Sequence, residues 1–183
     1  MEQRVVRFGV IGCGLMGREF ASAASRWLHL EGMAARPEIV AVCDTNDELM
    51  KWFVDRLPSV TQATGDYREL VANPELDAVY CAVPHILHGE IYPAVIRAGK
   101  HLLGEKPFGM DASQNRVISD AVAARPDVLV RCSSEMPFYP GAQRMIDLIL
   151  GGEVGDIVSS RQDSFTRLTS TRTSRSTGSG LRV

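Results

Sequence analysis

The chain has 183 residues, of which 45% are hydrophobic and 23% are charged, a composition typical of a soluble globular protein. The formal net charge of −2 gives no electrostatic basis for binding nucleic acid or an anionic membrane, and no apolar run approaches the ~20 residues that span a bilayer. The amino terminus lacks the residue order of a signal peptide, so we expect a cytoplasmic protein.

Short β-rich segments alternate with helical patterns, which is typical of βαβ units around a parallel sheet. We therefore predict an α/β fold, a doubly wound parallel-sheet Rossmann domain, followed by only the start of a second α/β domain. The expected strands are residues 7–12, 38–44, 77–83, 100–106 and 127–133, with a weaker strand near Val60. The expected helices are residues 15–30, 46–57, 67–71, 86–98 and 112–124.

Side chains that can accept hydrogen bonds stand at several expected helix starts. Asp44 and Thr45 are predicted to cap the second helix, Asp66 the third and Asp111 the fifth, because each can accept from a free backbone N–H. Gly99 follows the fourth helix, where a left-handed residue is needed.

The four cysteines are Cys13, Cys43, Cys81 and Cys132. None forms a CxxC pair, and their spacing favours neither a zinc site nor a disulfide framework. They are predicted to be small buried residues in a reducing compartment.

A glycine-rich turn lies between the first expected strand and the first expected helix. In VIGCGLMG, Gly12 allows the tight turn, Gly14 lets the backbone approach a pyrophosphate, and Gly17 lets the helix pack closely on the strand. The phosphates would meet free N–H groups at the helix N-terminus. A glycine-rich turn that binds nothing is the alternative, and the strand-turn-helix context argues against it.

Asp44 ends the second strand, where a carboxylate would accept hydrogen bonds from the adenosine ribose. It stands 32 residues after Gly12, and the extra length falls in the first helix and the loop after it. No Arg or Lys follows closely, so an added 2′-phosphate would meet negative charge and NAD is preferred over NADP. Asp44 as a helix cap alone is the alternative, and it is compatible with ribose binding.

Two histidines follow the third of the long strands, in AVPHILH. His85 and His88 can lie either as helix-start polar residues at the sheet edge or as part of the nicotinamide crevice. No third ligand is evident nearby, so a metal site is not expected.

The segment GEKPFG puts Glu105 and Lys106 at the same end of the sheet. A partly desolvated lysine there can donate to a substrate hydroxyl and favour developing alkoxide charge. A surface ion pair between Glu105 and Lys106 is the alternative, and these residues alone do not decide between the two.

The composition and pattern of the sequence change after Glu135. A helix at 139–150, a Gly-rich turn and one strand at 156–162 are expected, and they would leave an apolar face exposed, which favours aggregation or self-association. From Thr166 the chain is rich in Ser, Thr and Arg and is predicted to be disordered. One hypothesis is that this tail is an out-of-frame translation. The expected domains are residues 1–136 (NAD-binding Rossmann domain), 137–165 (truncated start of the substrate domain) and 166–183 (tail).

Taken together, these motifs resemble the Gfo/Idh/MocA family of NAD(P)-dependent sugar and polyol dehydrogenases, from about Arg7 to Phe165. The segments that carry the resemblance, in order, are VIGCGLMG, the Asp44 strand end, AVPHILH, GEKPFG, and FYP before a helix that ends in GGEVGDI.

The resemblance implies an NAD site, an active-site lysine and a Lys106–Pro107 bond that can be cis. Lys106 is the implied catalytic residue. The implied cofactor-binding residues are Gly12, Gly14, Leu15, Met16, Gly17, Asp44, Val83, Pro84, His85, His88, Glu105 and Lys106.

The chain also departs from the family pattern. His85 stands where the family commonly has Asn, and Glu135-Met136 where it often has Asn-Arg. The family's downstream Asp and His, the latter its usual general acid/base, have no counterpart by position.

The resemblance favours an oxidoreductase that transfers hydride between NAD(H) and a sugar, polyol or related hydroxy compound, with this chain as a truncated form. A non-catalytic NAD-binding module or regulator is the alternative, and a reductase of another Rossmann lineage is less favoured. The expected partner is a small-molecule substrate, and the full-length form is expected to be a homo-oligomer.

Overall fold

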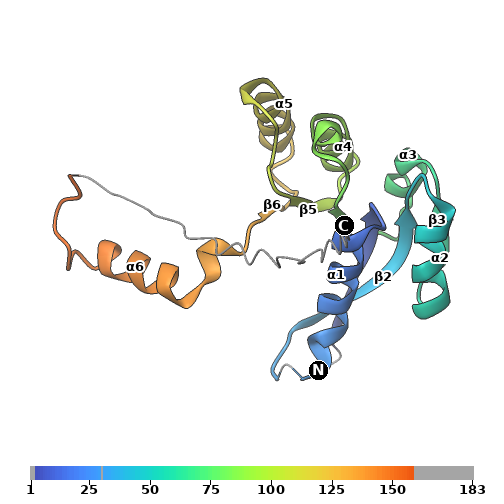
Figure 1. The fold of residues 1–183 in the computed structure, drawn as a ribbon, viewed down its shortest axis with the longest axis horizontal. Coiled ribbons are helices and arrows are strands. Elements are labelled where there is room, and N and C mark those ends of the chain that lie inside the picture. The colour runs from blue at the N-terminus through green and yellow to red at the C-terminus, as the bar shows by residue number, and fades with distance from the viewer. Residues whose placement is uncertain (1–2, 30, 159–183) are drawn as a thin grey trace, which may run out of the picture. The chain divides into compact units, whose positions relative to one another are not determined.

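A computed structural model describes residues 3–29 and 31–158 of the chain. The chain divides into two compact units, the first running from Met1 to Pro137 and the second beginning at Phe138. The first unit contains the sheet and the second contains a single described helix (Figure 1).

A six-stranded sheet forms the centre of the first unit, and every strand pair in it is parallel. The strand order is β3-β2-β1-β4-β5-β6, so the chain moves outward from β1 in one direction and then in the other. This is the predicted doubly wound Rossmann arrangement. The strands are β1 (Arg4–Ile11), β2 (Ala35–Cys43), β3 (Gln62–Thr64), β4 (Ala78–Cys81), β5 (His101–Glu105) and β6 (Val130–Ser133).

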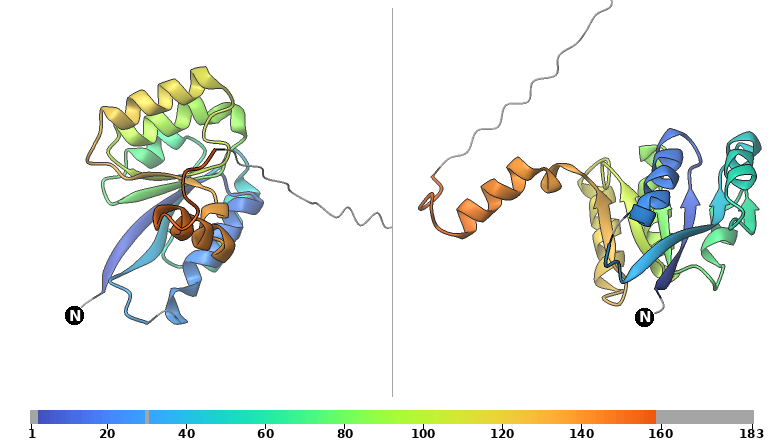
Figure 2. Two further views of the ribbon diagram at one scale, coloured as in Figure 1. Left: turned by 90° about the vertical axis from the view of Figure 1, so that its left-hand side faces the viewer. Right: turned by 90° about the horizontal axis from the view of Figure 1, so that it is seen from below.

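Helices cover both faces of the sheet, as the two views in Figure 2 show. One core packs the sheet against α3, α4 and α5 through side chains such as Leu70, Tyr92 and Ile118. The other packs it against α1 and α2 through Ala21 and Phe53. Burial on both faces explains the nearly continuous apolar character of the strands. The helices are α1 (Leu15–Ala24), α2 (Asp47–Arg56), α3 (Tyr67–Val71), α4 (His88–Arg97) and α5 (Ala112–Ala123).

The predicted elements are present, with corrections at their ends. The α-helix expected over 15–30 ends at Ala24 and continues as a 3₁₀ helix, Ser25–His29. At this point the Ser25 hydroxyl donates to the Ala21 carbonyl, an interaction that competes with regular helix geometry. The helix expected from 86 opens with a 3₁₀ turn, His85–Leu87, and the weak strand expected near Val60 is β3.

The predicted helix caps are confirmed at two positions and wrong at one. Asp66 and Asp111 each accept a hydrogen bond from a backbone N–H in the first turn of their helices. Helix α2 is capped by Asn46, which accepts from the Glu48 N–H, and not by Asp44 or Thr45. Separately, Gly99 has φ +78°, as predicted for its place after α4.

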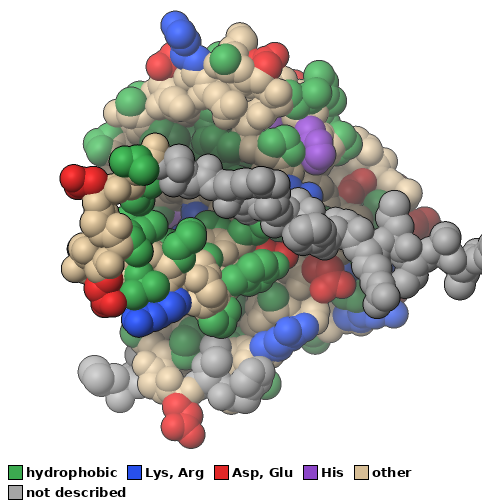
Figure 3. Space-filling view, turned by 60° about the vertical axis from the view of Figure 1, so that its left-hand side comes forward, with side chains coloured by type: hydrophobic (Ala, Val, Ile, Leu, Met, Phe, Trp, Pro, Cys, Tyr) green, Lys and Arg blue, Asp and Glu red, His purple; other side chains and the backbone are tan. Residues whose placement is uncertain are grey.

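The second unit contains α6 (Pro140–Leu150), close to the helix expected over 139–150. None of its side chains is buried, and Met145 and Leu150 are 57% and 82% exposed. Hydrophobic side chains stand open at the molecular surface in Figure 3. Residues 156–158 form no strand, and both the remainder of the strand expected over 156–162 and the tail lie outside the described residues. Within the described ranges, no helix combines the length and apolarity needed to cross a bilayer.

Candidate functional site

The predicted site residues gather where the carboxyl ends of the strands meet. β1 lies between β2 and β4, and the chain builds the sheet outward from β1 first on the β2 side and then on the β4 side. Ligands of open α/β sheets bind outside the strand ends at the point where this direction changes. The turn after β1, the tip of β2 and the loops after β4 and β5 all lie at this edge.

The glycine turn after β1 needs glycine at two positions for reasons internal to the fold. Gly12 has φ +95°, and a Cβ there would lie 2.4 Å from the Ala82 carbonyl oxygen. A Cβ on Gly17 would lie 2.3 Å from the Gly12 carbonyl oxygen, so only glycine lets α1 pack this close to the turn.

Gly14 is different, because the empty protein gives no reason for glycine there. Its φ of −69° is ordinary, and a Cβ would meet nothing within 4 Å. It is the N-cap of α1 and offers no side-chain acceptor to the first N–H groups of the helix. The open space and uncapped amides form a site suited to an anion.

Asp44 connects the tip of β2 to the glycine turn. One carboxylate oxygen accepts from the Cys13 N–H at 2.8 Å, and the other accepts from the Asn46 N–H at 2.9 Å. A carboxylate has about four acceptor positions, so two remain for ribose hydroxyls. The backbone bonds orient the carboxylate before any ligand binds.

A cavity of about 470 Å³, here called the larger cavity, opens between the glycine turn and the start of α4. Its walls are mostly apolar, and the charged residues among them are Asp44 and Glu90. An apolar cleft with few polar groups is the usual form of a small-molecule site. The lining residues are Ile11, Gly12, Gly14, Cys43, Asp44, Thr45, Leu49, Gly65, Tyr67, Ala82, Val83, Pro84, Leu87, Glu90 and Ile91.

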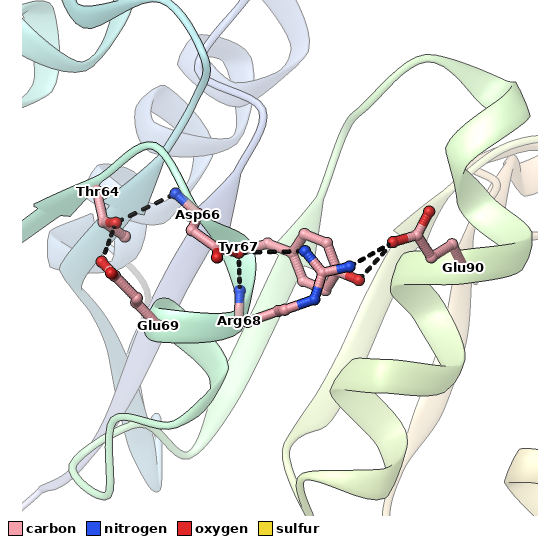
Figure 4. A network of polar contacts seen from close by, with 6 residues as sticks. All are labelled: Thr64, Asp66, Tyr67, Arg68, Glu69 and Glu90. Carbon is pink, nitrogen blue, oxygen red and sulfur yellow. Dashed lines mark hydrogen bonds and ion pairs between the residues drawn. The ribbon is translucent and has the colours of Figure 1, made fainter.

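A polar network joins α3 to α4 at the larger cavity (Figure 4). The Tyr67 hydroxyl and the Arg68 guanidinium donate to the same Glu90 oxygen, at 2.7 and 2.9 Å. Sequence reasoning missed Tyr67 and Glu90. The Asp66 cap could have pointed to Tyr67, because a cap at Asp66 makes Tyr67 the first residue of α3, next to the edge of the site.

A second cavity, of about 100 Å³ and here called the smaller cavity, lies toward β5. Ala82 and Val83 line both cavities, so both reach the loop after β4. The other lining residues are Met16, His85, Glu105 and Lys106. The predicted residues of α1, β4 and β5 therefore meet in one place. Leu15 is at the start of α1 and is 74% exposed.

Glu105 is buried, at 7% exposure, and does not form the surface ion pair considered from the sequence. One of its carboxylate oxygens accepts from the Tyr80 hydroxyl at 2.8 Å, and the other accepts from the Lys106 N–H at 3.2 Å. Burial, and then the hydrogen bond to Glu105, raises the pKa of Tyr80. The phenol therefore stays protonated and holds Glu105 from inside the core.

Lys106 is exposed at the edge of the smaller cavity. Its ammonium has no carboxylate partner within 4 Å among the described residues, so it can donate to a ligand. The peptide bond to Pro107 is cis, as expected.

The two histidines have different environments. His85 is exposed and lines the smaller cavity. His88, in contrast, is fully buried, so it does not border the crevice as expected, and both of its ring nitrogens face backbone carbonyl oxygens. Across residues 3–29 and 31–158 there is no cluster of three or more potential metal ligands.

Three of the cysteines, Cys13, Cys43 and Cys81, are buried, and all four are free. Burial, and next the nearby Asp44 carboxylate, raises the pKa of Cys13 and of Cys43 to about 12. These thiols are neutral and unreactive near neutral pH. They pack in the core, as the sequence predicted, whereas Cys132 on β6 is only partly buried and departs from that prediction.

The sheet order, the uncapped glycine turn and the acid at the second strand tip define a dinucleotide-binding α/β protein. Residues 6–131 match the sequence model of the Gfo/Idh/MocA group, described as an oxidoreductase family with an NAD-binding Rossmann fold. The chain belongs to this family.

Several curated relatives are named as dehydrogenases or reductases. The chain is 32% identical to 1,5-anhydro-D-fructose reductase of Ensifer adhaerens, covering 85% of the chain and 44% of the reductase. It is 33% identical to D-xylose 1-dehydrogenase (NADP(+)) of Hypocrea jecorina, covering 67% of the chain and 32% of that enzyme. The chain thus spans less than half the length of these relatives.

Solved structures show the same fold. Levoglucosan dehydrogenase in complex with NADH and levoglucosan superimposes with a TM-score of 0.76 at 26% identity, over 84% of the chain and 41% of that structure. The scyllo-inositol dehydrogenase of Lactobacillus casei, with bound NAD(H) and scyllo-inositol, gives 0.73 at 21% identity, over 84% and 43%.

Proposed function

We propose that the chain binds NAD(H) across the strand ends, with the adenosine half in the larger cavity and the nicotinamide in the smaller one. The pyrophosphate would lie against the first N–H groups of α1. The observation that carries this proposal is Gly14, an uncapped helix start with open space where the fold itself does not need glycine. Gly14 lines the larger cavity and Met16 lines the smaller one, so both cavities reach the start of α1, as a dinucleotide bound there would require.

NAD(H) is proposed over NADP(H) on electrostatic grounds. Asp44 lines the larger cavity and would face the adenosine ribose, and the next residues are Thr45, Asn46 and Asp47, with no cation among them. A 2′-phosphate would have to displace or neutralise the Asp44 carboxylate. One relative at 33% identity uses NADP(+), so a direct comparison of NADH with NADPH is informative.

We propose that the whole protein transfers hydride between NAD(H) and a hydroxyl carbon of a sugar, polyol or related compound. Bound NAD would supply the hydride acceptor. Lys106 would donate a hydrogen bond to the reacting hydroxyl oxygen, and its charge would favour alkoxide character as the hydride leaves. The hydroxyl proton would pass to a general base, a role that the family gives to its downstream histidine. Glu105, fixed by the Tyr80 hydroxyl and by the Lys106 N–H, would keep the lysine backbone in place.

The remaining parts of the proposal follow from the resemblance and from the buried thiols. Residues 137–165 are proposed to begin a substrate domain, which in the family would form both the substrate site and the oligomer interface. A cytoplasmic location is proposed because the cysteines are free, which fits a reducing compartment.

Calorimetric titration of the folded chain with NADH and NADPH tests the binding proposal. We expect a 1:1 association with NADH and a weaker one with NADPH. The absence of any NADH association would contradict it. A panel of sugars and polyols with NAD then separates the two candidate functions. In the whole protein, turnover that is lost in Lys106→Met supports the dehydrogenase, whereas NADH binding without turnover supports the NAD-binding module.

A further inference from the structure

Two loops line the smaller cavity, and one buried side chain contacts both of them. His88, the first residue of α4, is fully buried. Its Nδ1 lies 2.8 Å from the Pro107 carbonyl oxygen in the loop after β5. Its Nε2 lies 3.1 Å from the Val83 carbonyl oxygen in the loop after β4. A neutral imidazole donates to one of these carbonyls and a protonated one to both, so in either state the ring lies between the two loops.

The ring of His88 is itself held by Tyr92, one turn further along α4. The two rings stack with centroids 4.4 Å apart, and the Tyr92 hydroxyl donates to the Glu105 carbonyl oxygen at 2.8 Å. A Cβ on Gly104 would lie 2.6 Å from the Tyr92 ring, so β5 has no room to move toward the helix. His88 therefore contacts the backbone of both loops, and Tyr92 contacts the last residue of β5, just before the second loop.

We propose that His88 is a positioning residue for the nicotinamide end of the site. It contacts no ligand, because it has no exposed surface. It acts through the carbonyls of Val83 and Pro107, which set the spacing of the two loops and hence the place of Val83, Glu105 and Lys106 around the smaller cavity. This inference depends on the proposed NAD(H) binding.

The test compares NADH with ADP-ribose, which lacks the nicotinamide, in the full chain and in His88→Phe. Phenylalanine keeps the ring stacked on Tyr92 but donates to neither carbonyl. We expect NADH affinity to fall about tenfold, the loss of one to two hydrogen bonds, and ADP-ribose affinity to stay within about twofold. His88→Gln, which retains an N–H donor, should recover part of the NADH affinity. A residue that merely stabilised the fold would weaken both ligands equally.

His101→Phe is the matched control. His101 also joins a loop to β5, since its Nδ1 accepts from the Leu129 N–H at 3.0 Å, but it does so at the opposite end of the strand. This variant should change neither affinity. If His88→Phe weakens both ligands alike or neither, the proposal is wrong. If the unsubstituted chain binds ADP-ribose but not NADH, the nicotinamide site fails as well, and if it binds neither, the proposed function itself fails.

A measurement on the unsubstituted chain covers the case in which the His88 variants do not fold. The imidazole ¹H–¹⁵N correlations of His88 should shift when NADH binds and stay in place when ADP-ribose binds. Equal shifts with both ligands would overturn the proposal.

Discussion

Replacing Gly14 by aspartate should stabilise the empty chain and at the same time abolish NADH binding. The new carboxylate would stand at the N-cap of α1, where the backbone has φ −69° and a Cβ meets nothing within 4 Å. It would accept hydrogen bonds from the same helix N–H groups that we assign to the pyrophosphate. The two effects therefore have opposite signs at one position.

The size of each effect follows from the position of Gly14. Aspartate in place of an N-cap glycine gains a few tenths of a kcal/mol, and its charge at the helix N-terminus adds about 0.3–1 kcal/mol. A gain of about 1 kcal/mol raises Tm by roughly 2–4 °C. In the complex, two like charges about 4 Å apart repel by about 4 kcal/mol at an effective dielectric constant of about 20. This corresponds to a loss of NADH affinity of about 1000-fold.

Thermal unfolding without ligand and a fluorescence titration with NADH measure the two effects. Gly14→Ala is the control, because it adds a methyl group without charge or acceptor and should weaken NADH much less than Gly14→Asp. If Gly14→Asp binds NADH as well as the unsubstituted chain, the pyrophosphate does not lie at the start of α1. A fall in Tm would show that the space at Gly14 is not free.

Two further predictions concern the fold around the site. Gly17→Ala should destabilise the fold by about 2 kcal/mol and lower Tm by roughly 4–8 °C, because its Cβ would lie 2.3 Å from a backbone oxygen in the turn. In an ordinary helix the same substitution is stabilising. An unchanged or higher Tm would contradict this close packing. Burial raises the pKa of Cys13 and Cys43 from 9.0 to about 12, so the folded state holds these protons more tightly than the unfolded state. The contribution of these two thiols to stability should therefore be constant below about pH 9 and fall as pH rises toward about 12, and urea midpoints measured over that range should fall with it. Alanine at either cysteine should reduce the slope, and a flat profile would refute the assignment.

The elements of the first unit were largely predictable because their signals are local. The apolar strands and the helix starts at Asp66 and Asp111 depend on residues within a few positions of one another. The errors occur where two local signals compete. Asn46 was overlooked as a cap because Asp44 and Thr45 were assigned that role, and the structure uses Asp44 to hold the glycine turn instead.

The site residues were predictable where they belong to a known motif. They were unpredictable where their role depends on a contact with a residue on another helix, strand or loop. His88 shows the limit, because its spacing from His85 suggests a shared surface, yet it is buried between two loops. Similarly, the sequence around Glu105 and Lys106 is compatible with a surface ion pair and with a substrate contact. Only the position of Tyr80 on the neighbouring strand turns Glu105 inward.

The amino-acid sequence by itself determined the doubly wound fold, the glycine turn and the family, because hydrophobic period and short motifs are properties of neighbouring residues. The tertiary structure alone decided which polar groups face a ligand and which face each other. That choice depends on contacts between residues far apart in the chain, such as Cys13 with Asp44 and Tyr67 with Glu90, which no local pattern specifies.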